Sequence, residues 1–158
     1  MSRIDDRLAE LGLSLPAPTA APPGVELPFA LVRVSGDRAY ISGHGPADGA
    51  ERLFEGKVGR DVTLEQAHEA ARATGLSMLA SLRQELGDLD RVKRWIKALG
   101  LVNCAPGFNQ TPAVMNGFTN LILDLWGPEA GRHARSAVGA AELPFDIPVE
   151  IEAIVEIG

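Results

Sequence analysis

Two periods of hydrophobic and polar positions alternate along this chain, and they divide it into helices and strands. Apolar side chains recur every three or four positions between Thr63 and Gly87, and again between Thr111 and Gly127. This is the spacing of amphipathic helices. The other apolar stretches are short, rich in aliphatic residues and flanked by turn residues, which is typical of strands. They comprise residues 27–34, 38–42, 92–103, 133–140 and 148–157.

The ends of both predicted helices carry capping residues. Thr63 followed by Gln66 is a capping box, and Gly87 is a common kind of helix stop. Thr111 places an N-cap directly before a proline at the first helical position. Gly75 interrupts the first helix at a cost of about 1 kcal/mol relative to alanine. We therefore expect the helix to pack closely on a sheet at Gly75.

The N-terminal part differs in character from the rest. Residues 2–11 predict a short amphipathic helix, and residues 14–24, with four prolines, predict an extended arm lying over the body. The glycine-rich residues 43–61 predict a loop with little regular structure. We therefore divide the chain into a helix and proline-rich arm, 1–26, and a folded domain, 27–158.

The elements follow one another in the order β-β-α-β-α-β-β. This order predicts an α+β fold in which two helices cover one face of a single sheet. In the last strand, alternation turns Val149 and Ile151 toward the helices and Glu150 and Glu152 toward the other face. A face with this many glutamates is either wet or in contact with another subunit.

The composition indicates one soluble globular domain. The chain has 158 residues, of which 46% are hydrophobic and 23% charged, and no apolar run long enough to cross a bilayer. Its first residues carry acids and do not resemble a signal peptide. A lone Cys104 permits no disulfide within the chain, so we expect a cytoplasmic protein.

The charge argues against a nucleic-acid partner, since the net charge is −6. One basic stripe surrounds Trp95, and it comprises Arg91, Lys93, Arg94 and Lys97. The stripe fits either a strip that contacts RNA with a stacking aromatic or, as we favour, a solvated strand face. The three histidines and one cysteine have no metal-binding spacing, so we expect no metal.

Two charged residues are candidates for chemistry. Arg135 stands where a loop turns into an apolar strand, where it can bind a carboxylate with two parallel hydrogen bonds or form an ion pair with a terminal glutamate. Glu150 is a candidate acid or base if an apolar floor raises its pKa, and otherwise a solvated side chain. Gly43 and Gly45 either let backbone groups approach a ligand or carry a turn, and we place His44, which lies between them, near a site.

The closing run ARSAVGAAELPFDIPVEIEAIVEI resembles the signature of the RidA/YjgF family, also called endoribonuclease L-PSP. The hairpin ending YISGHGP is similar to the family's I-x-S-G-Q-x-P, and GDLDRVKRW resembles its second signature. The resemblance covers residues 27–157. It implies a chorismate-mutase-like fold and a homotrimer with ligand clefts between subunits.

The resemblance also implies an activity, namely cofactor-free hydrolysis of enamines and imines to keto acids and ammonia. Arg135 matches the arginine that holds the substrate carboxylate, and Glu150 the glutamate that positions water. Asn116 matches an asparagine of the cleft, and Gly43 a glycine whose backbone contacts ligand. The implied partner is a small carboxylate or imino acid.

Several positions depart from the family pattern. Phe29 replaces a tyrosine, Ala137 a cysteine and His44 a glutamine. A longer loop and the N-terminal arm are similar to a branch of longer, less characterised members. We expect Phe29 and His44 to shape the cleft.

Three functions follow from this resemblance. The first is a deaminase acting on 2-imino acids or 2-aminoacrylate. The second is a non-catalytic trimer that binds small carboxylates, which Phe29 favours because its ring carries no hydroxyl. The third and weakest is an endoribonuclease.

Overall fold

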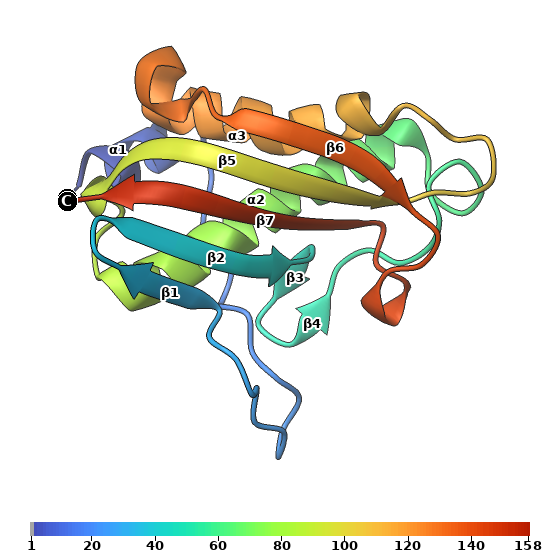
Figure 1. Ribbon diagram of the computed structural model, residues 1–158, viewed down its shortest axis with the longest axis horizontal. Coiled ribbons are helices and arrows are strands. Elements are labelled where there is room, and N and C mark those ends of the chain that lie inside the picture. Colours follow the sequence, from blue (N-terminus) through green and yellow to red (C-terminus); the bar gives the residue numbers. More distant parts are fainter. Residues whose placement is uncertain (1) are drawn as a thin grey trace.

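A five-stranded sheet with helices behind it forms the body of the protein in the computed structural model, which describes residues 2–158 (Figure 1). The elements are α1 (Arg3–Glu10), β1 (Val32–Ser35), β2 (Arg38–His44), β3 (Ala47–Asp48), β4 (Glu51–Arg52), α2 (Leu64–Leu86), η1 (Leu89–Arg91), β5 (Val92–Asn103), α3 (Thr111–Gly131), β6 (Ala134–Ala140), η2 (Pro144–Asp146) and β7 (Val149–Ile157). This is the predicted α+β fold.

The sheet has the strand order β1-β2-β7-β5-β6. Only β5 and β6 run parallel, because α3 connects them as a crossover, and the other neighbours are antiparallel. The chain's last strand therefore lies at the centre of the sheet, between β2 and β5. β3 and β4 form a separate small hairpin.

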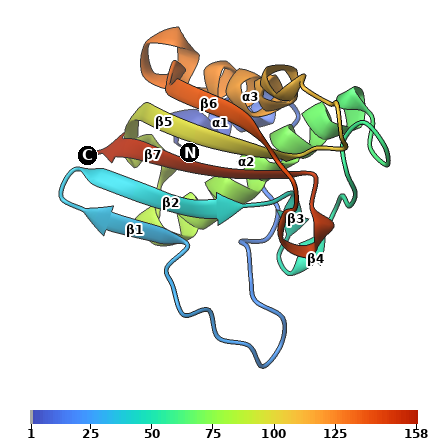
Figure 2. The ribbon, with the colours of Figure 1, turned by 45° about the vertical axis from the view of Figure 1, so that its right-hand side comes forward.

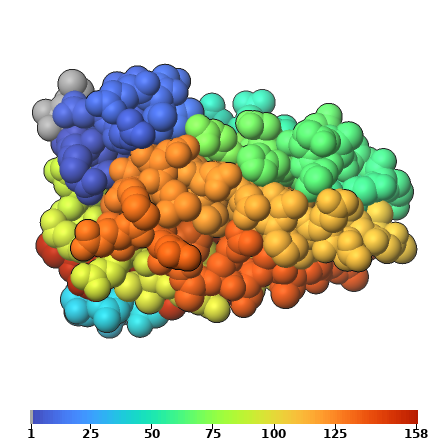
Figure 3. Space-filling model, turned by 90° about the horizontal axis from the view of Figure 1, so that it is seen from above, coloured from blue at the N-terminus to red at the C-terminus, as the bar shows by residue number. Residues whose placement is uncertain are grey.

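Each face of the sheet has its own surroundings. α2 and α3 cover one face, and α1 lies against α3 and η1 (Figures 1 and 3). Val149, Ile151 and Val155 of β7 are buried under the helices, whereas Glu150 and Glu152 point to the open face. This confirms the alternation predicted for the last strand.

The ends of α2 follow the predicted caps, whereas the N-cap predicted at Thr111 was wrong: Gln110 holds that position in α3, and the Thr111 hydroxyl donates a hydrogen bond to the Ala137 carbonyl (2.9 Å) instead of capping the helix. Thr63 accepts a hydrogen bond from the Gln66 backbone, and the Gln66 side chain accepts one from the Thr63 backbone. The main run of α3 ends at Gly127, whose φ of 76° and ψ of 173° are not helical, before one further turn to Gly131.

The packing at Gly75 differs from the expectation. A Cβ on Gly75 would lie 2.8 Å from Leu121 Cδ2 of α3, and a Cβ on Gly117 would overlap the backbone carbonyl of His68 in α2. Gly75 thus serves the crossing of two helices. The expectation that it packs on the sheet was wrong, because periodicity shows which face is buried but not what covers it.

Two strand boundaries also differ. Residues 27–30 are irregular, since Pro28 has no N–H to donate, and β1 begins only at Val32. The predicted loop 43–61 contains the β3–β4 hairpin.

The N-terminal residues belong to the same body. Ile4 and Leu8 of α1 are buried in the core, and Asp90 accepts hydrogen bonds from the backbone of Arg3 and Ile4. The following arm loops below the sheet and returns to β1 (Figure 2). None of the helices within residues 2–158 is long and apolar enough to span a membrane.

Candidate functional site

Glu150 lies against Gly43 on the open face of the sheet. A side chain at Gly43 would overlap the Glu150 carboxylate, so the glycine gives this group its place beside the β2 backbone. Burial raises the pKa of Glu150, and the nearby Glu152 carboxylate raises it further. Glu150 makes no ion pair with any residue in 2–158. A carboxyl in this state can exchange a proton nearer neutral pH than an ordinary glutamate can.

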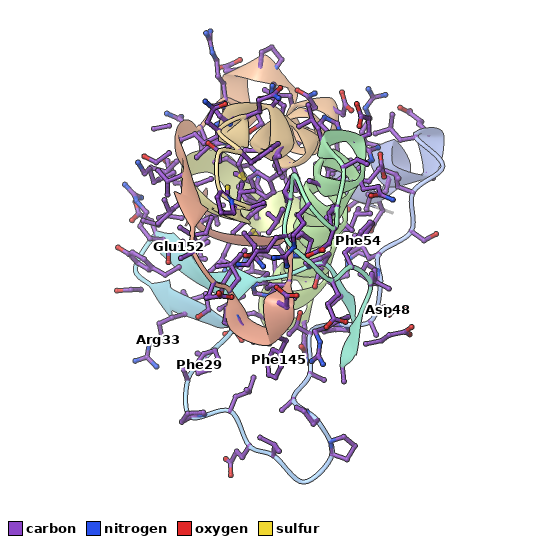
Figure 4. The ribbon with its side chains drawn as sticks, turned by 90° about the vertical axis from the view of Figure 1, so that its right-hand side faces the viewer. Phe29, Arg33, Asp48, Phe54, Phe145 and Glu152 are labelled. Carbon is purple, nitrogen blue, oxygen red and sulfur yellow. The ribbon has the colours of Figure 1, made fainter. Side chains whose placement is uncertain are left out.

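A cavity of about 440 Å³ opens beside Glu150 and Gly43. Its wall includes the arm, the β3–β4 hairpin and η2, and the Phe29 ring, 55% exposed, lines it as well. Figure 4 shows Phe29 and Phe145 on the side of the body that faces the arm. Phe29, Gly43 and Glu150, all expected at the site, thus lie together.

Phe145 lies in a turn whose backbone is strained and is held by hydrogen bonds. Phe145 and Asp146 both have a φ of 57°, a conformation that non-glycine residues rarely adopt. The buried Asn103 side chain donates hydrogen bonds to the Asp146 carboxylate (2.9 Å) and the Ile147 carbonyl (3.1 Å). Lys57 in turn donates to Asn103 Oδ1 at 2.8 Å. This network fixes the η2 turn that presents Phe145 to the cavity.

Arg135 forms a second group with two residues of α3. Its Nη1 donates hydrogen bonds to Asn116 Oδ1 (2.8 Å) and Thr119 Oγ1 (3.1 Å). No carboxylate within residues 2–158 pairs with it, so the structure does not support the alternative of an ion pair with a terminal glutamate. Two neutral acceptors orient the guanidinium and leave its positive charge unpaired, as a binder of anions requires.

His133 supports this second group. Its Nδ1 lies 2.8 Å from the Gly131 carbonyl and its Nε2 3.1 Å from Thr119 Oγ1. Burial lowers the pKa of His133, and the Arg135 charge lowers it further. A neutral imidazole donates a hydrogen bond from Nδ1 and accepts one from the Thr119 hydroxyl at Nε2. The hydroxyl oxygen then turns a lone pair toward Arg135, from which it accepts a hydrogen bond.

Neither Thr119 nor His133 was expected at the site. The sequence carries two usable signals: Thr119 is one turn beyond Asn116 on the same helix, and His133 lies two residues before Arg135.

The two groups do not meet within one chain. Arg135 pairs in register with Ala98, which is buried under the helices, whereas Glu150 pairs with Leu101 on the open face. Two strand spacings and three residues along the strand separate their Cα atoms by roughly 14 Å. The structure thus brings Arg135 to Asn116 and Glu150 to Gly43, but not Arg135 to Glu150.

His44 does not line the cavity. Its ring is 1% exposed, with Nδ1 2.6 Å from the Ser42 carbonyl and Nε2 2.9 Å from the Ser81 hydroxyl of α2. A β-bulge between Ile41 and His44 turns both side chains to the helix-covered face. The expectation that the His44 side chain shapes the cleft was therefore wrong, and the residue anchors β2 to α2.

The aromatic residue of the basic stripe, Trp95, does not lie on the surface. Trp95 is 2% exposed and packs edge-on against Phe118 and Trp126, so it cannot stack on a base. The structure therefore favours a solvated strand face over an RNA-contacting strip. Burial raises the pKa of the Cys104 thiol, which makes this cysteine a poor nucleophile. Among residues 2–158, no group of three or more His, Cys, Asp or Glu is placed to hold a metal ion.

Comparison with known proteins identifies the family. The model of the "YjgF/chorismate mutase-like, putative endoribonuclease" family matches residues 5–152. The chain therefore belongs to the RidA/YjgF family. The match begins within α1, so it extends further toward the N-terminus than the resemblance of residues 27–157.

Individual relatives cover nearly the whole chain. Protein TCP17 of Trypanosoma cruzi is 40% identical over 155 residues, which are 98% of this chain and 94% of TCP17. The crystal structure of Atu1372 from Agrobacterium tumefaciens, a protein of unknown function, is 41% identical with a TM-score of 0.88; the similarity covers 99% of this chain and 93% of that one. The structure of E. coli TdcF with bound serine shares the fold, with 21% identity, a TM-score of 0.60, and 90% and 94% coverage.

Proposed function

We propose that this protein hydrolyses 2-imino acids, and enamines that tautomerise to them, to 2-keto acids and ammonia. Water adds to the imine carbon, and the resulting carbinolamine loses ammonia as its hydroxyl becomes the keto oxygen. One water is consumed and one ammonia released, with no change of oxidation state. The observation that carries the proposal is the pair of half-sites: an unpaired, oriented arginine and a carboxyl of raised pKa.

Arg135 supplies the binding part. Its guanidinium, oriented by Asn116 and Thr119, takes the carboxylate that every 2-imino acid carries next to its reacting carbon. Binding this carboxylate fixes the position of the imine relative to the protein. Part of the entropy cost of bringing the reacting groups together is therefore met when the substrate binds, and it no longer adds to the barrier of the chemical step.

Glu150 supplies the proton transfer. As a carboxylate it accepts a proton from the attacking water, and as a carboxylic acid it returns that proton to the departing nitrogen. Its raised pKa suits both steps better than that of an ordinary glutamate does, because the protonated form persists to higher pH. Gly43 leaves room for this carboxylate beside the β2 backbone.

The halves combine between protomers of a homotrimer in this proposal. Arg135 of one protomer faces Glu150 of the next, because one chain cannot bring them together. The open sheet face supports such an assembly, since it exposes Tyr40 (47%) and Val138 (46%) among its charges. TdcF, which shares the fold, was crystallised with serine, a small molecule that carries a carboxylate.

A non-catalytic binder of small carboxylates is the second candidate, and Phe29 favours it. The exposed phenyl ring lines the cavity without a hydroxyl that could take part in proton transfer. In this case Arg135 would bind the same carboxylates, and Glu150 would shape the pocket without turnover. The endoribonuclease named in the family's description gains no support from the buried Trp95.

An assay with a freshly generated substrate separates these candidates. A pyridoxal-phosphate dehydratase acting on serine releases 2-aminoacrylate, and pyruvate formation is followed with and without this protein. We expect acceleration by the wild type and none by Arg135→Ala or Glu150→Gln. If the protein binds pyruvate but does not accelerate its formation, the result supports the non-catalytic binder. If both variants still accelerate the reaction, the result contradicts the assigned site.

A further inference from the structure

The cavity beside Glu150 is larger and more apolar than the smallest 2-imino acid requires. Most of its lining side chains are apolar, and the larger ones include Pro22, Val25, Leu27, Phe29, Phe145 and Ile147. Its volume of about 440 Å³ lies in the range of pockets that hold drug-sized molecules. With 2-aminoacrylate bound at Glu150, most of this apolar wall would remain in contact with water.

The arm is a fixed wall of this cavity. Ala20 N donates a hydrogen bond to the Gly49 carbonyl (3.2 Å), and Gly49 N donates to the Ala17 carbonyl (3.1 Å). The Asp48 carboxylate accepts from Ala17 N at 2.8 Å. The Thr19 hydroxyl lies 2.9 Å from the hydroxyl of the buried Ser77 in α2. The arm is thus bonded to the β3–β4 hairpin and α2, so the cavity is formed before a ligand binds.

The opposite wall is also built to hold an exposed ring. Phe145 is 67% exposed although its backbone is strained, and Asn103 holds the turn through Asp146 and Ile147. The Arg52 guanidinium lies 4.3 Å from the centre of the Phe145 ring. Strain that persists at a ligand cavity and exposes a large apolar side chain indicates a binding role.

We infer that this cavity is the specificity pocket for the substrate's side group, and that the preferred substrates are 2-imino acids with a bulky aromatic or branched aliphatic substituent. This inference rests on the proposed function, because the orientation of the ligand comes from it. Arg135 of a neighbouring protomer holds the carboxylate, the imine carbon lies at Glu150, and the substituent extends between the arm and Phe145. Glu150 lines the cavity itself, so the reacting carbon and the pocket are contiguous.

Isothermal titration with stable keto acids tests the pocket without requiring turnover. Phenylpyruvate and 4-methyl-2-oxopentanoate are compared with pyruvate on the full-length protein. We expect both larger acids to bind at least about tenfold more tightly than pyruvate, since even one methylene in an apolar pocket changes affinity by roughly this factor. Equal or weaker binding of the larger acids would overturn the inference.

Two variants locate the preference. Ala21→Trp fills the cavity from the arm, and Phe145→Ala removes the opposite ring; each should abolish the preference while pyruvate still binds. Ala30→Trp, an exposed position outside the cavity, is the matched control and should retain it. A preference that survives Ala21→Trp and Phe145→Ala would place the side group elsewhere. A preference that survives Arg135→Ala would separate this cavity from the carboxylate site, and would also overturn the inference.

Failure of the proposed function gives a different pattern. The larger keto acids could bind preferentially while their imines, generated by an amino-acid oxidase, are hydrolysed no faster with the protein than without it. This result would support the pocket and contradict the proposed catalysis. If 2-aminoacrylate is hydrolysed without any preference for larger acids, catalysis stands and the pocket is wrong.

Discussion

Arg135 and Glu150 lie on opposite faces of the same sheet, with β5 between their strands. Each has a local partner, Asn116 for the arginine and Gly43 for the glutamate, so each half-site is formed within the single chain. A ligand that touches both must therefore be bound by two protomers, which makes oligomerisation a condition of activity in the proposed mechanism.

Mixed oligomers should show this directly. When Arg135→Ala and Glu150→Gln chains are co-expressed with different tags, each interface that joins an intact arginine to an intact glutamate forms a complete site. In a cyclic trimer that contains both chains, whichever is in excess, one interface in three is of this kind, so such sites are about one third of the total. We expect that fraction of wild-type 2-aminoacrylate hydrolysis from purified mixed oligomers, and none from either variant alone. Mixed oligomers without activity would place both residues in one chain's site or outside it.

Glu150→Gln should stabilise the folded protein while removing its activity. The raised pKa of Glu150 means that the folded state binds a proton more readily than the unfolded state. The carboxyl therefore destabilises the fold increasingly as pH rises through its folded pKa, and glutamine removes this effect. Thermal unfolding at pH 4 and pH 8 measures it: the variant's gain should appear only at the higher pH. Glu156→Gln on the same strand is the control, and an equal gain there would contradict the assignment to burial at Glu150.

The buried His44 and the half-buried His133 should make stability fall on mild acidification. Burial lowers the pKa of His44 and of His133 below the ordinary value of about 6.5. Between these lowered values and pH 6.5 the unfolded chain binds more protons, so the free energy of unfolding decreases as pH falls through this window. Urea unfolding between pH 7.5 and 5.5 should show the decrease, and His44→Gln and His133→Gln should each reduce it. An unchanged slope in both variants would contradict this origin.

Asn103→Ala should destabilise the protein through the η2 turn. The substitution removes the acceptor of Lys57 and the donor to Asp146 and Ile147 in a buried place. Leaving such groups unsatisfied costs about 1–3 kcal/mol, more where a charge is involved. Chemical denaturation measures the loss, and Asn109→Ala, an exposed neighbour, should change stability by less than about 0.5 kcal/mol. Similar losses in both variants would show that the network does not stabilise the turn.

Gly117→Ala should destabilise the protein at the close crossing of α2 and α3. The added methyl group would overlap the His68 backbone carbonyl, which cannot move aside as a flexible side chain can. Overpacking of this kind costs about 1–3 kcal/mol or more. The midpoint of thermal unfolding should fall, whereas Asn120→Ala, exposed on α3, should leave it within a degree or two of the wild type. A wild-type midpoint for Gly117→Ala would contradict the close crossing.

The sequence by itself determined the two long helices, the five strands of the main sheet and the buried side of β7. The capping box at Thr63, the stop at Gly127 and the alternation through β7 depend on residues close in the chain, whose preferences act locally. The closing motif likewise indicated the family, and with it Arg135, Asn116, Gly43 and Glu150 as candidates.

Only the tertiary structure decided how these residues meet. One extra residue in β2 turned His44 from the expected cleft into the core, and alternation cannot reveal such a bulge. The helix that fills the space above Gly75, and the support of Arg135 by Thr119 and His133, depend on elements brought together by packing. The separation of Arg135 from Glu150 has the same cause, because strand order and register arise from the whole sheet and from no single segment of it.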